Sequence, residues 1–357
     1  MSSTIQEVLR DLADMEPGDV PVLSAYLDMR PQATGERPAL RSGLVVLKDR
    51  LREIEKVVWP RGPAYDSFTA DATRINRYVD EALPASAQGV AIFASADRNL
   101  FEVVEAGVPF ENEVAFAPTP DLFQLARFSD QQETAVVGVV DTNTARLFVL
   151  RAGFLEDVGG PSHEGTHFKW HRKGALNQAR YQRHIKNHRL DFAREAAAEI
   201  ERLVDREGAT RLILAGDEVS IPLLRAALSP RIAEMAHDEV LRFDMRVPQT
   251  EVERTVAPIL AEAEAEDSYS LADQLINAVE ADLLGVIGVE QTRAALEQAQ
   301  VDVLLLMEEA EVDAETRNKL IRLAMTTGAD VEVVERHDTF QHLGGVGALL
   351  RYRHDVR

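Results

Sequence analysis

The part of the chain that most restricts its fold is the C-terminal segment, where helical and strand patterns alternate without a break. Apolar spacing predicts helices over 290–298 and 314–327, with strands at 301–307, 330–335 and 347–352. Short apolar strands that alternate with amphipathic helices fold as a sheet carrying helices on both faces. The sequence therefore predicts a small αβα sandwich at this end of the chain.

Two further α/β units precede the sandwich. In the first unit, apolar runs predict strands at 20–27, 89–94 and 100–104, and helical spacing predicts helices at 44–58 and about 70–83. Strands and helices interleaved in this way indicate a sheet that is flanked by helices.

The second unit begins near residue 132. Two β-rich runs, 134–140 and 145–151, are joined by Asp-Thr-Asn-Thr, a turn-rich link that predicts a hairpin. A long amphipathic helix is expected from about 177 to 206, and strands are expected at 212–216 and 240–245.

The chain from Thr250 to about Ala281 is expected to be helical and is rich in acidic residues, and we place a domain boundary inside it. The predicted fold is an α/β protein of three domains, each a mixed or mainly β-sheet flanked by helices. The domains are residues 1–130, 131–267 and 268–357. A length of 357 residues and a hydrophobic content of 45% are enough for three such cores.

The composition excludes several classes of protein. The chain has no cysteine, which removes disulfides, thiolate metal sites and cysteine nucleophiles. No apolar run approaches the roughly 18 residues of a membrane span, and the N-terminus lacks the pattern of a signal peptide. These features predict a soluble, cytoplasmic protein. The net charge of −21 argues against a generic nucleic-acid binder, so any RNA contact must be local.

Residues 163–189 reverse the acidic balance of the chain. This basic segment has one acid, Glu164, and five of the nine histidines. Its cations and interleaved aromatic side chains are Lys169, Trp170, His171, Arg172, Lys173, Arg180, Tyr181, Arg183, His184, Lys186 and Arg189. Cations neutralise RNA phosphates, while aromatic and guanidinium planes stack on bases. We interpret the segment as an RNA contact; the alternative is an ordinary solvated helix face.

Other motifs carry less chemistry. His163, Glu164 and His167 match H-E-x-x-H, a zinc pattern that needs both histidines on one face of a helix. A preceding Gly-Gly-Pro-Ser and the internal Gly165 argue against a helix, so we predict no metal site. No G-x-G-x-x-G or G-K-[ST] motif is present, and we interpret Gly344-Gly345-Val346-Gly347 as a backbone turn. No cofactor is predicted.

A family resemblance is clearest in the C-terminal segment. Residues 288–297, 301–306 and the closing 344–353 resemble the last domain of archaeal and eukaryotic class-one release factors. The hairpin at 134–150 is similar to the start of their middle domain, and short runs within 24–93 echo their first domain. The resemblance implies a first domain of the decoding-centre type and a middle domain that corresponds to the catalytic domain.

Two active motifs of that family are missing. Release factors hydrolyse peptidyl-tRNA with a Gly-Gly-Gln loop that leads into the long middle-domain helix. The matching place here reads Lys173-Gly174-Ala175-Leu176-Asn177-Gln178, without the triplet, and the chain lacks the Asn-Ile-Lys-Ser element that reads stop codons. The chain therefore looks like pelota or like the Balon type of bacterial hibernation factor, which implies occupation of the A site of idle ribosomes.

The resemblance also implies partners and contacts. The partners are the ribosome, with its 16S and 23S rRNA, and optionally elongation factor Tu or another translational GTPase; no membrane and no DNA are implied. The expected rRNA-binding residues are Lys169, Trp170, His171, Arg172, Lys173, Gly174, Asn177, Gln178, Arg180, Tyr181, Arg183, His184 and Lys186. The expected decoding-centre contacts are Arg37, Arg41, Lys48, Arg50 and Arg52.

Three functions stay open on the sequence alone. The first is a ribosome hibernation factor, acting in a stress response without hydrolytic activity. The second is a peptidyl-tRNA hydrolase for peptide release or ribosome rescue, with Gln178 as its catalytic residue. The third is an RNA-binding adaptor that acts outside the A site.

Overall fold

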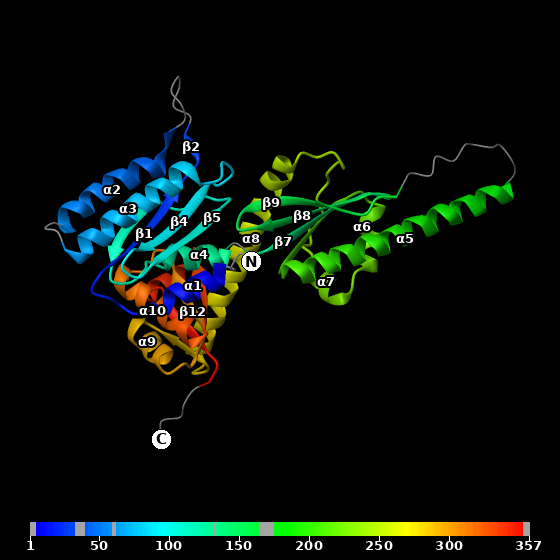
Figure 1. Ribbon diagram of the computed structural model, residues 1–357. Coiled ribbons are helices and arrows are strands. Elements are labelled where there is room, and N and C mark those ends of the chain that lie inside the picture. The colour runs from blue at the N-terminus through cyan, green and yellow to red at the C-terminus, as the bar shows by residue number, and fades with distance from the viewer. Residues whose placement is uncertain (1–4, 33–39, 59–61, 132, 164–174, 353–357) are drawn as a thin grey trace. The chain divides into compact units, whose positions relative to one another are not determined.

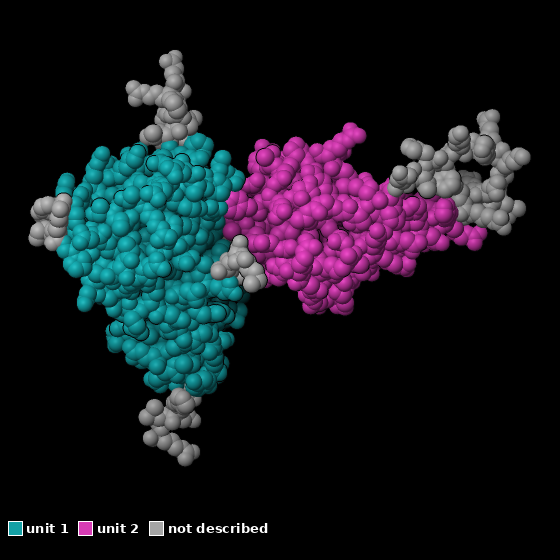
Figure 2. Space-filling view, viewed as in Figure 1, with its two compact units in different colours: residues 1–131, 261–357 teal, residues 132–260 magenta. Residues whose placement is uncertain are grey.

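The computed structural model describes residues 5–32, 40–58, 62–131, 133–163 and 175–352, which contain three four-stranded sheets (Figure 1). The predicted α/β fold class, with three sheets flanked by helices, is confirmed. The chain forms two compact units, coloured in Figure 2. Unit 1 comprises residues 1–131 and 261–357, and unit 2 comprises residues 132–260. The three domain boundaries drawn from the sequence stay a prediction.

The first sheet, in unit 1, is antiparallel throughout. Its strand order is β5 (Leu100–Ala106), β4 (Gly89–Ser95), β1 (Val22–Asp28) and β6 (Glu113–Ala117). The sequence prediction missed β6, because this edge strand is only half-buried and lacks the apolar run of its neighbours. A two-residue ladder pairs β2 (Pro31–Gln32) with β3 (Leu40–Arg41).

Two helices cover one face of this sheet. Successive residues of a strand point to opposite faces, and Leu23, Ala25 and Leu27 of β1 face the core beneath α2 (Ser42–Val58) and α3 (Pro63–Glu81). The predicted helix at about 70–83 in fact begins at residue 63, because Pro63 occupies the first turn, where a missing N–H costs nothing.

The other face of the first sheet meets α4 (Phe123–Gln131), which the sequence prediction missed. The hydroxyl of Tyr26 donates to the carbonyl of Asp121 at 2.6 Å, and the N–H of Asp121 donates to Ser24 Oγ at 3.0 Å. Five of the nine residues of α4 are buried, which is typical of a helix covered on more than one side. A second helix, α1 (Ile5–Ala13), packs on α4.

The third sheet, also in unit 1, is the αβα sandwich predicted from the sequence. Its order is β11 (Gly285–Ile287), β14 (Val346–Leu350), β12 (Val301–Met307) and β13 (Asp330–Val334). One face carries α9 (Val289–Glu297) and α10 (Ala314–Thr327). The other packs on α11 (Asp338–His342) and the second half of α8 (Gln249–Glu280).

A joint inside unit 1 holds the first and third sheets together. The side chain of Asn318 on α10 accepts a hydrogen bond from Leu122 N at 2.9 Å and donates one to the carbonyl of Pro120 at 2.7 Å. Arg322 donates to two carbonyls at the C-terminal end of α1 and just beyond it, and Asp130 on α4 accepts from the N–H of Val333 on β13 at 2.8 Å. The two ends of the chain are therefore parts of one packed body.

Unit 2 holds the middle sheet, in the order β10 (Arg211–Gly216), β7 (Ala135–Val140), β8 (Ala145–Arg151) and β9 (Phe154–Gly159). The predicted hairpin is β7 and β8, and β10 runs parallel to β7. The connection from β9 to β10 contains α5 (Ala175–Glu207), which the sequence predicted as a long helix. One face packs on α5, α6 (Ser220–Ala227) and α7 (Pro230–Glu234), and the other on the first half of α8.

The strand predicted at 240–245 is wrong. Only Leu241 pairs with the sheet, through an isolated bridge to Ala215. The alternating residues Phe243 and Met245 produce a strand-like pattern, but they pack against the core under α8 instead of continuing the ladder. None of the helices in the described part of the chain is long and apolar enough to cross a membrane.

Candidate RNA interface

The long helix α5 has two halves with different surroundings. From residue 192 onward it packs on the middle sheet, with Phe192, Ala196 and Ile200 buried. Between 183 and 191 it has no buried residue, and Figure 1 shows the helix running on beyond the strands of its own sheet. A helix segment without buried residues can present its side chains to a partner. The basic segment begins before α5 and continues into this half.

The chain is fastened to α5 where it enters the basic segment. His163 Nε2 lies 2.6 Å from Oε2 of Glu195, and its ring makes a tilted contact with His188 and an edge contact with Phe192, with centroids 5.3 and 5.2 Å apart. His163 lies outside any helix, so it does not share a helix face with another histidine as a zinc protease requires. Residues 164–174 lie outside the described chain.

Two cations in the packed half of α5 pair with acids on the same helix. Arg194 pairs with Asp191 and Arg202 pairs with Glu199, each three residues away on the same helix. No acid occurs between Glu164 and Asp191, and Lys186 is exposed without a partner among the described residues. Positive charge is therefore concentrated on the projecting half of the helix, which fits contact with an anionic polymer.

Arg189 affects the pKa of Asp217, which lies in the loop after β10. Burial alone would raise the pKa of Asp217, but the N–H groups of Ser220 and Val219, the Ser220 hydroxyl and the charge of Arg189 together lower it. The Asp217 carboxylate accepts from Val219 N at 2.8 Å and from Ser220 N at 2.7 Å, and so holds the turn that leads into α6. Arg189, in the projecting half of α5, thus has an acidic neighbour in the loop after β10.

The structure places the predicted rRNA-binding residues in three groups. Lys169, Trp170, His171, Arg172, Lys173 and Gly174 lie outside the described residues. Asn177, Gln178, Arg180 and Tyr181 lie in the first turns of α5, where only the backbone is described. Arg183, His184 and Lys186 are exposed on the projecting half of α5. The contact of His163 with Glu195 was missed, because no local pattern links residues 32 positions apart.

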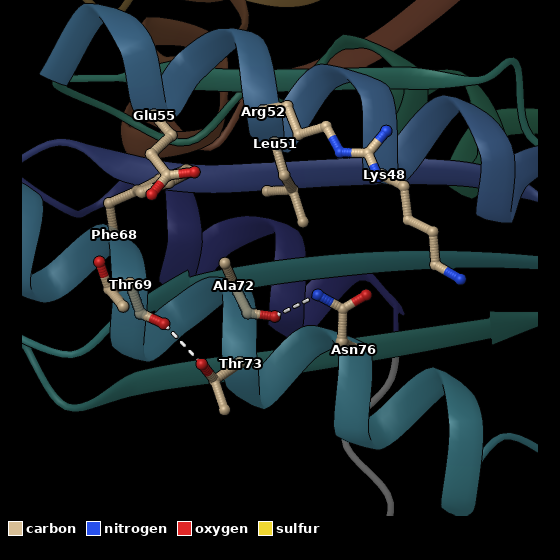
Figure 3. A pocket seen from close by; sticks show the side chains of 9 residues that line it. All are labelled: Lys48, Leu51, Arg52, Glu55, Phe68, Thr69, Ala72, Thr73 and Asn76. Atoms are coloured by element: carbon tan, nitrogen blue, oxygen red, sulfur yellow. Dashed lines mark hydrogen bonds between the residues drawn. The ribbon is translucent and has the colours of Figure 1, made fainter.

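The predicted decoding-centre residues are only partly brought together. Lys48 and Arg52 line one groove between α2 and α3, with a volume of about 260 Å³ (Figure 3). Arg50 is exposed on α2 and pairs with Glu53, Arg41 is half-buried in β3, and Arg37 lies outside the described residues. The groove unites two of the five predicted cations.

The groove has a cationic end and a polar wall. Arg52 pairs with Asp49 at 3.2 Å, and both side chains are exposed, whereas Lys48 has no partner among the described residues. On the opposite wall, Asn76 Nδ2 donates to the carbonyl of Ala72 at 2.8 Å, which leaves its Oδ1 facing the groove (Figure 3). Lys48 would supply the positive charge that an anionic ligand in this groove requires.

One group of carboxylates among the described residues has the spacing of a metal site. Oxygen atoms of Asp130, Glu264 and Glu332 lie within 4.8 Å of one another. Asp130 already accepts from Val333 N, and Glu332 accepts from the hydroxyl of Ser268 at 2.5 Å. Hydrogen bonds within unit 1 therefore already engage Asp130 and Glu332.

Two family models match the chain. Bacterial archaeo-eukaryotic release factor family 2 matches residues 134–281, and eRF1 domain 3 matches residues 266–354. The resemblance to release factors is thus confirmed for the middle and C-terminal parts of the chain. The first model contains the hairpin β7–β8 and all of α5, and the second contains the αβα sandwich.

Several solved structures are similar over most of the chain. A model of ribosome-bound archaeal Pelota and ABCE1 is 15% identical, with a TM-score of 0.47, over 99% of this chain and 95% of that one. The archaeal translation termination factor aRF1 is 16% identical, with a TM-score of 0.29, over 98% and 97%. Dom34 of S. cerevisiae, a translation termination-like factor that interacts with Hbs1, is 9% identical, with a TM-score of 0.46, over 75% and 79%. No curated protein matches the chain.

Proposed function

We propose that this chain is a cytoplasmic, ribosome-binding factor of the release-factor type that occupies the A site without hydrolysing peptidyl-tRNA. One observation carries the proposal: α5, within the region that matches a release-factor family, projects a basic half with no acid before Asp191 away from its sheet. In a protein of net charge −21, a local excess of cations on an unpacked helix is suited to rRNA phosphates.

The absence of hydrolysis rests on the sequence at the start of α5. A Gly-Gly-Gln loop needs backbone conformations that glycine adopts readily and that Ala175 and Leu176 adopt only at a cost. We therefore expect the segment to dock near the peptidyl-transferase centre of an idle ribosome and to leave the ester intact. Hibernation during stress is the role that this chemistry favours, with elongation factor Tu as the GTPase partner to be tested.

Competition with A-site tRNA on vacant 70S ribosomes tests the placement. Charge reversal of Lys186 should weaken ribosome binding and flatten its salt dependence. The slope of log K against log salt should change by about 0.7–0.9 for each phosphate that the variant no longer neutralises. The matched control is Lys319→Glu on α10, another exposed lysine without a partner among the described residues. Equal binding by both variants would count against α5 as the rRNA contact. Binding that A-site tRNA does not displace would favour an adaptor outside the A site.

Release of labelled peptide from stalled ribosome complexes tests the chemistry. The protein is expected to release no more peptide than buffer does, and Gln178→Ala is expected to change nothing. Release by the natural protein that disappears in Gln178→Ala would replace the hibernation role with peptidyl-tRNA hydrolysis.

A further inference from the structure

The exposed face of α8 in unit 1 carries a single stripe of acidic side chains around one tyrosine. A helix turns about 100° per residue, so Glu262, Glu266, Tyr269, Asp273 and Glu280 lie within about 60° of one another around the axis. All five are exposed, while Ala272, Leu275 and Ile276 of the same helix are buried against the third sheet. The stripe therefore lies on an exposed side of α8, and its Tyr269 edge borders the buried Ile276.

The protein itself does not neutralise this stripe. No basic residue occurs in the sequence between Arg254 and Arg293. Glu262, Glu266 and Glu280 have no ion-pair partner within the described ranges, whereas on the neighbouring α9 Arg293 pairs with both Glu290 and Glu297. Like charges four residues apart on a helix repel each other. A cationic partner would remove that repulsion.

The tyrosine in the middle of the stripe is held in place. Its ring centroid lies 4.3 Å from that of His337, with 33° between the planes; Tyr269 is 49% exposed and His337 only 2%. Nδ1 of His337 accepts from Phe340 N at 3.1 Å, so neutral His337 carries its proton on Nε2, which lies 3.2 Å from Asp273 Oδ1. His337 therefore positions both Tyr269 and Asp273 before any partner arrives.

We propose that the Tyr269 stripe is the docking face for a basic α-helix of a protein partner. A rigid, half-exposed aromatic ring flanked by carboxylates is suited to an arginine, whose guanidinium stacks on the ring and pairs with Asp273. The stripe runs about 27 Å along a straight helix, and its 4-3-4-7 spacing matches the side-chain rows of a second helix. RNA is excluded as the occupant because its phosphates carry the same sign of charge as the stripe.

A patterned peptide tests this proposal without the ribosome. The probe is a fluorescent helix-forming peptide with arginines spaced 4, 3, 4 and 7 residues apart, and its control is a scrambled peptide of the same composition. The full-length protein is expected to bind the patterned peptide several-fold more tightly in a fluorescence anisotropy titration. Tyr269→Ala should weaken this binding about tenfold, as for the loss of an aromatic anchor, and Tyr269→Phe should retain it.

Charge reversal provides the matched pair of variants. Glu262→Lys with Glu266→Lys should abolish the preference for the patterned peptide. Glu309→Lys with Glu311→Lys changes the net charge equally at exposed positions away from the stripe and should leave the affinity within about twofold. Equal affinity for the two peptides, or an equal loss of affinity in both double variants, would mean that the stripe attracts cations non-specifically. Either result would overturn the proposal. So would tighter binding of an RNA oligonucleotide that depends on Tyr269. The proposal is independent of ribosome binding through α5, so either can fail alone.

Discussion

The imidazole of His163 and the carboxylate of Glu195 are joined at 2.6 Å, which ties the first residue of the basic segment to the packed half of α5. Phe192 lies beneath the same imidazole and is buried in the core of unit 2. His163 is therefore held against the packed half of α5 through both a polar and an aromatic contact.

Removing the Glu195 carboxylate should loosen the chain around His163 without unfolding unit 2. Glu195→Ala is expected to speed amide hydrogen exchange in residues 159–163. The free energy of unfolding should fall by less than about 1 kcal/mol, because both side chains are partly exposed. Asp191→Ala, which breaks the exposed pair with Arg194 on the same helix, is the control and should leave the exchange there unchanged. Exchange mass spectrometry that finds the two variants alike would contradict the anchoring role.

Asn318 should contribute strongly to the stability of the joint between the first and third sheets. Asn318→Ala leaves the N–H of Leu122 and the carbonyl of Pro120 without their partner, so we expect a loss of roughly 2–3 kcal/mol in the free energy of unfolding. Lys319→Ala, at the next and exposed position, should stay within about 0.5 kcal/mol. Urea titration followed by far-UV circular dichroism measures both. Similar midpoints for the two variants would mean that the joint adds little to stability.

Asp121 should make unit 1 less stable as the pH rises. Burial raises the pKa of this carboxyl above its ordinary value, and the nearby Glu113 raises it further, against opposing effects of Phe123 N–H and Arg317. A raised folded-state pKa gives stability that is fully present below about pH 4 and is lost as the pH rises through the folded value.

The variant Asp121→Asn isolates this effect. It keeps an oxygen that can accept from Phe123 N and cannot ionise, so its stability relative to the natural protein should increase as the pH rises from about 4 to 7. Urea titrations across that range provide the measurement. Parallel pH curves for the two proteins would show that Asp121 is not the titrating group.

Two glycines with similar backbone angles should differ in what they tolerate. Gly328 ends α10 at φ 71°, with nothing within 4 Å of an added Cβ, so Gly328→Ala should cost about 1 kcal/mol of stability. Gly345 has φ 67°, and its Cβ would lie 2.8 Å from that of Met307. Gly345→Ala should cost about 1–3 kcal/mol more, because of overpacking. Thermal unfolding of the pair checks this, and equal losses would argue that β14 shifts to make room.

Most of the regular elements follow from local apolar periodicity. The αβα sandwich, the hairpin β7–β8 and the long α5 were predicted because their buried positions recur at the period of a strand or a helix. β6 and β11 were missed because they are short edge strands with few buried residues. The strand expected at 240–245 failed because alternating residues can be buried by a helix as well as by a ladder.

The candidate RNA interface was predictable in position and not in geometry. The lack of acids between Glu164 and Asp191 is visible in the sequence, and so is the long helix that contains much of this stretch. That the first half of this helix projects is a tertiary property, since it depends on where the sheet under Phe192 ends. Likewise, Lys48 and Arg52 share a groove only because α3 packs beside α2.

By itself the sequence determined most of the strands and helices, the basic segment within an acidic chain and the acidic character of α8. These depend on spacing and charge along short stretches. Only the tertiary structure decided that the two ends of the chain form one body. The hydrogen bond from Leu122 to Asn318 joins residues 196 positions apart. Periodicity shows which face of α10 must be buried, but any distant apolar surface of matching shape could cover it.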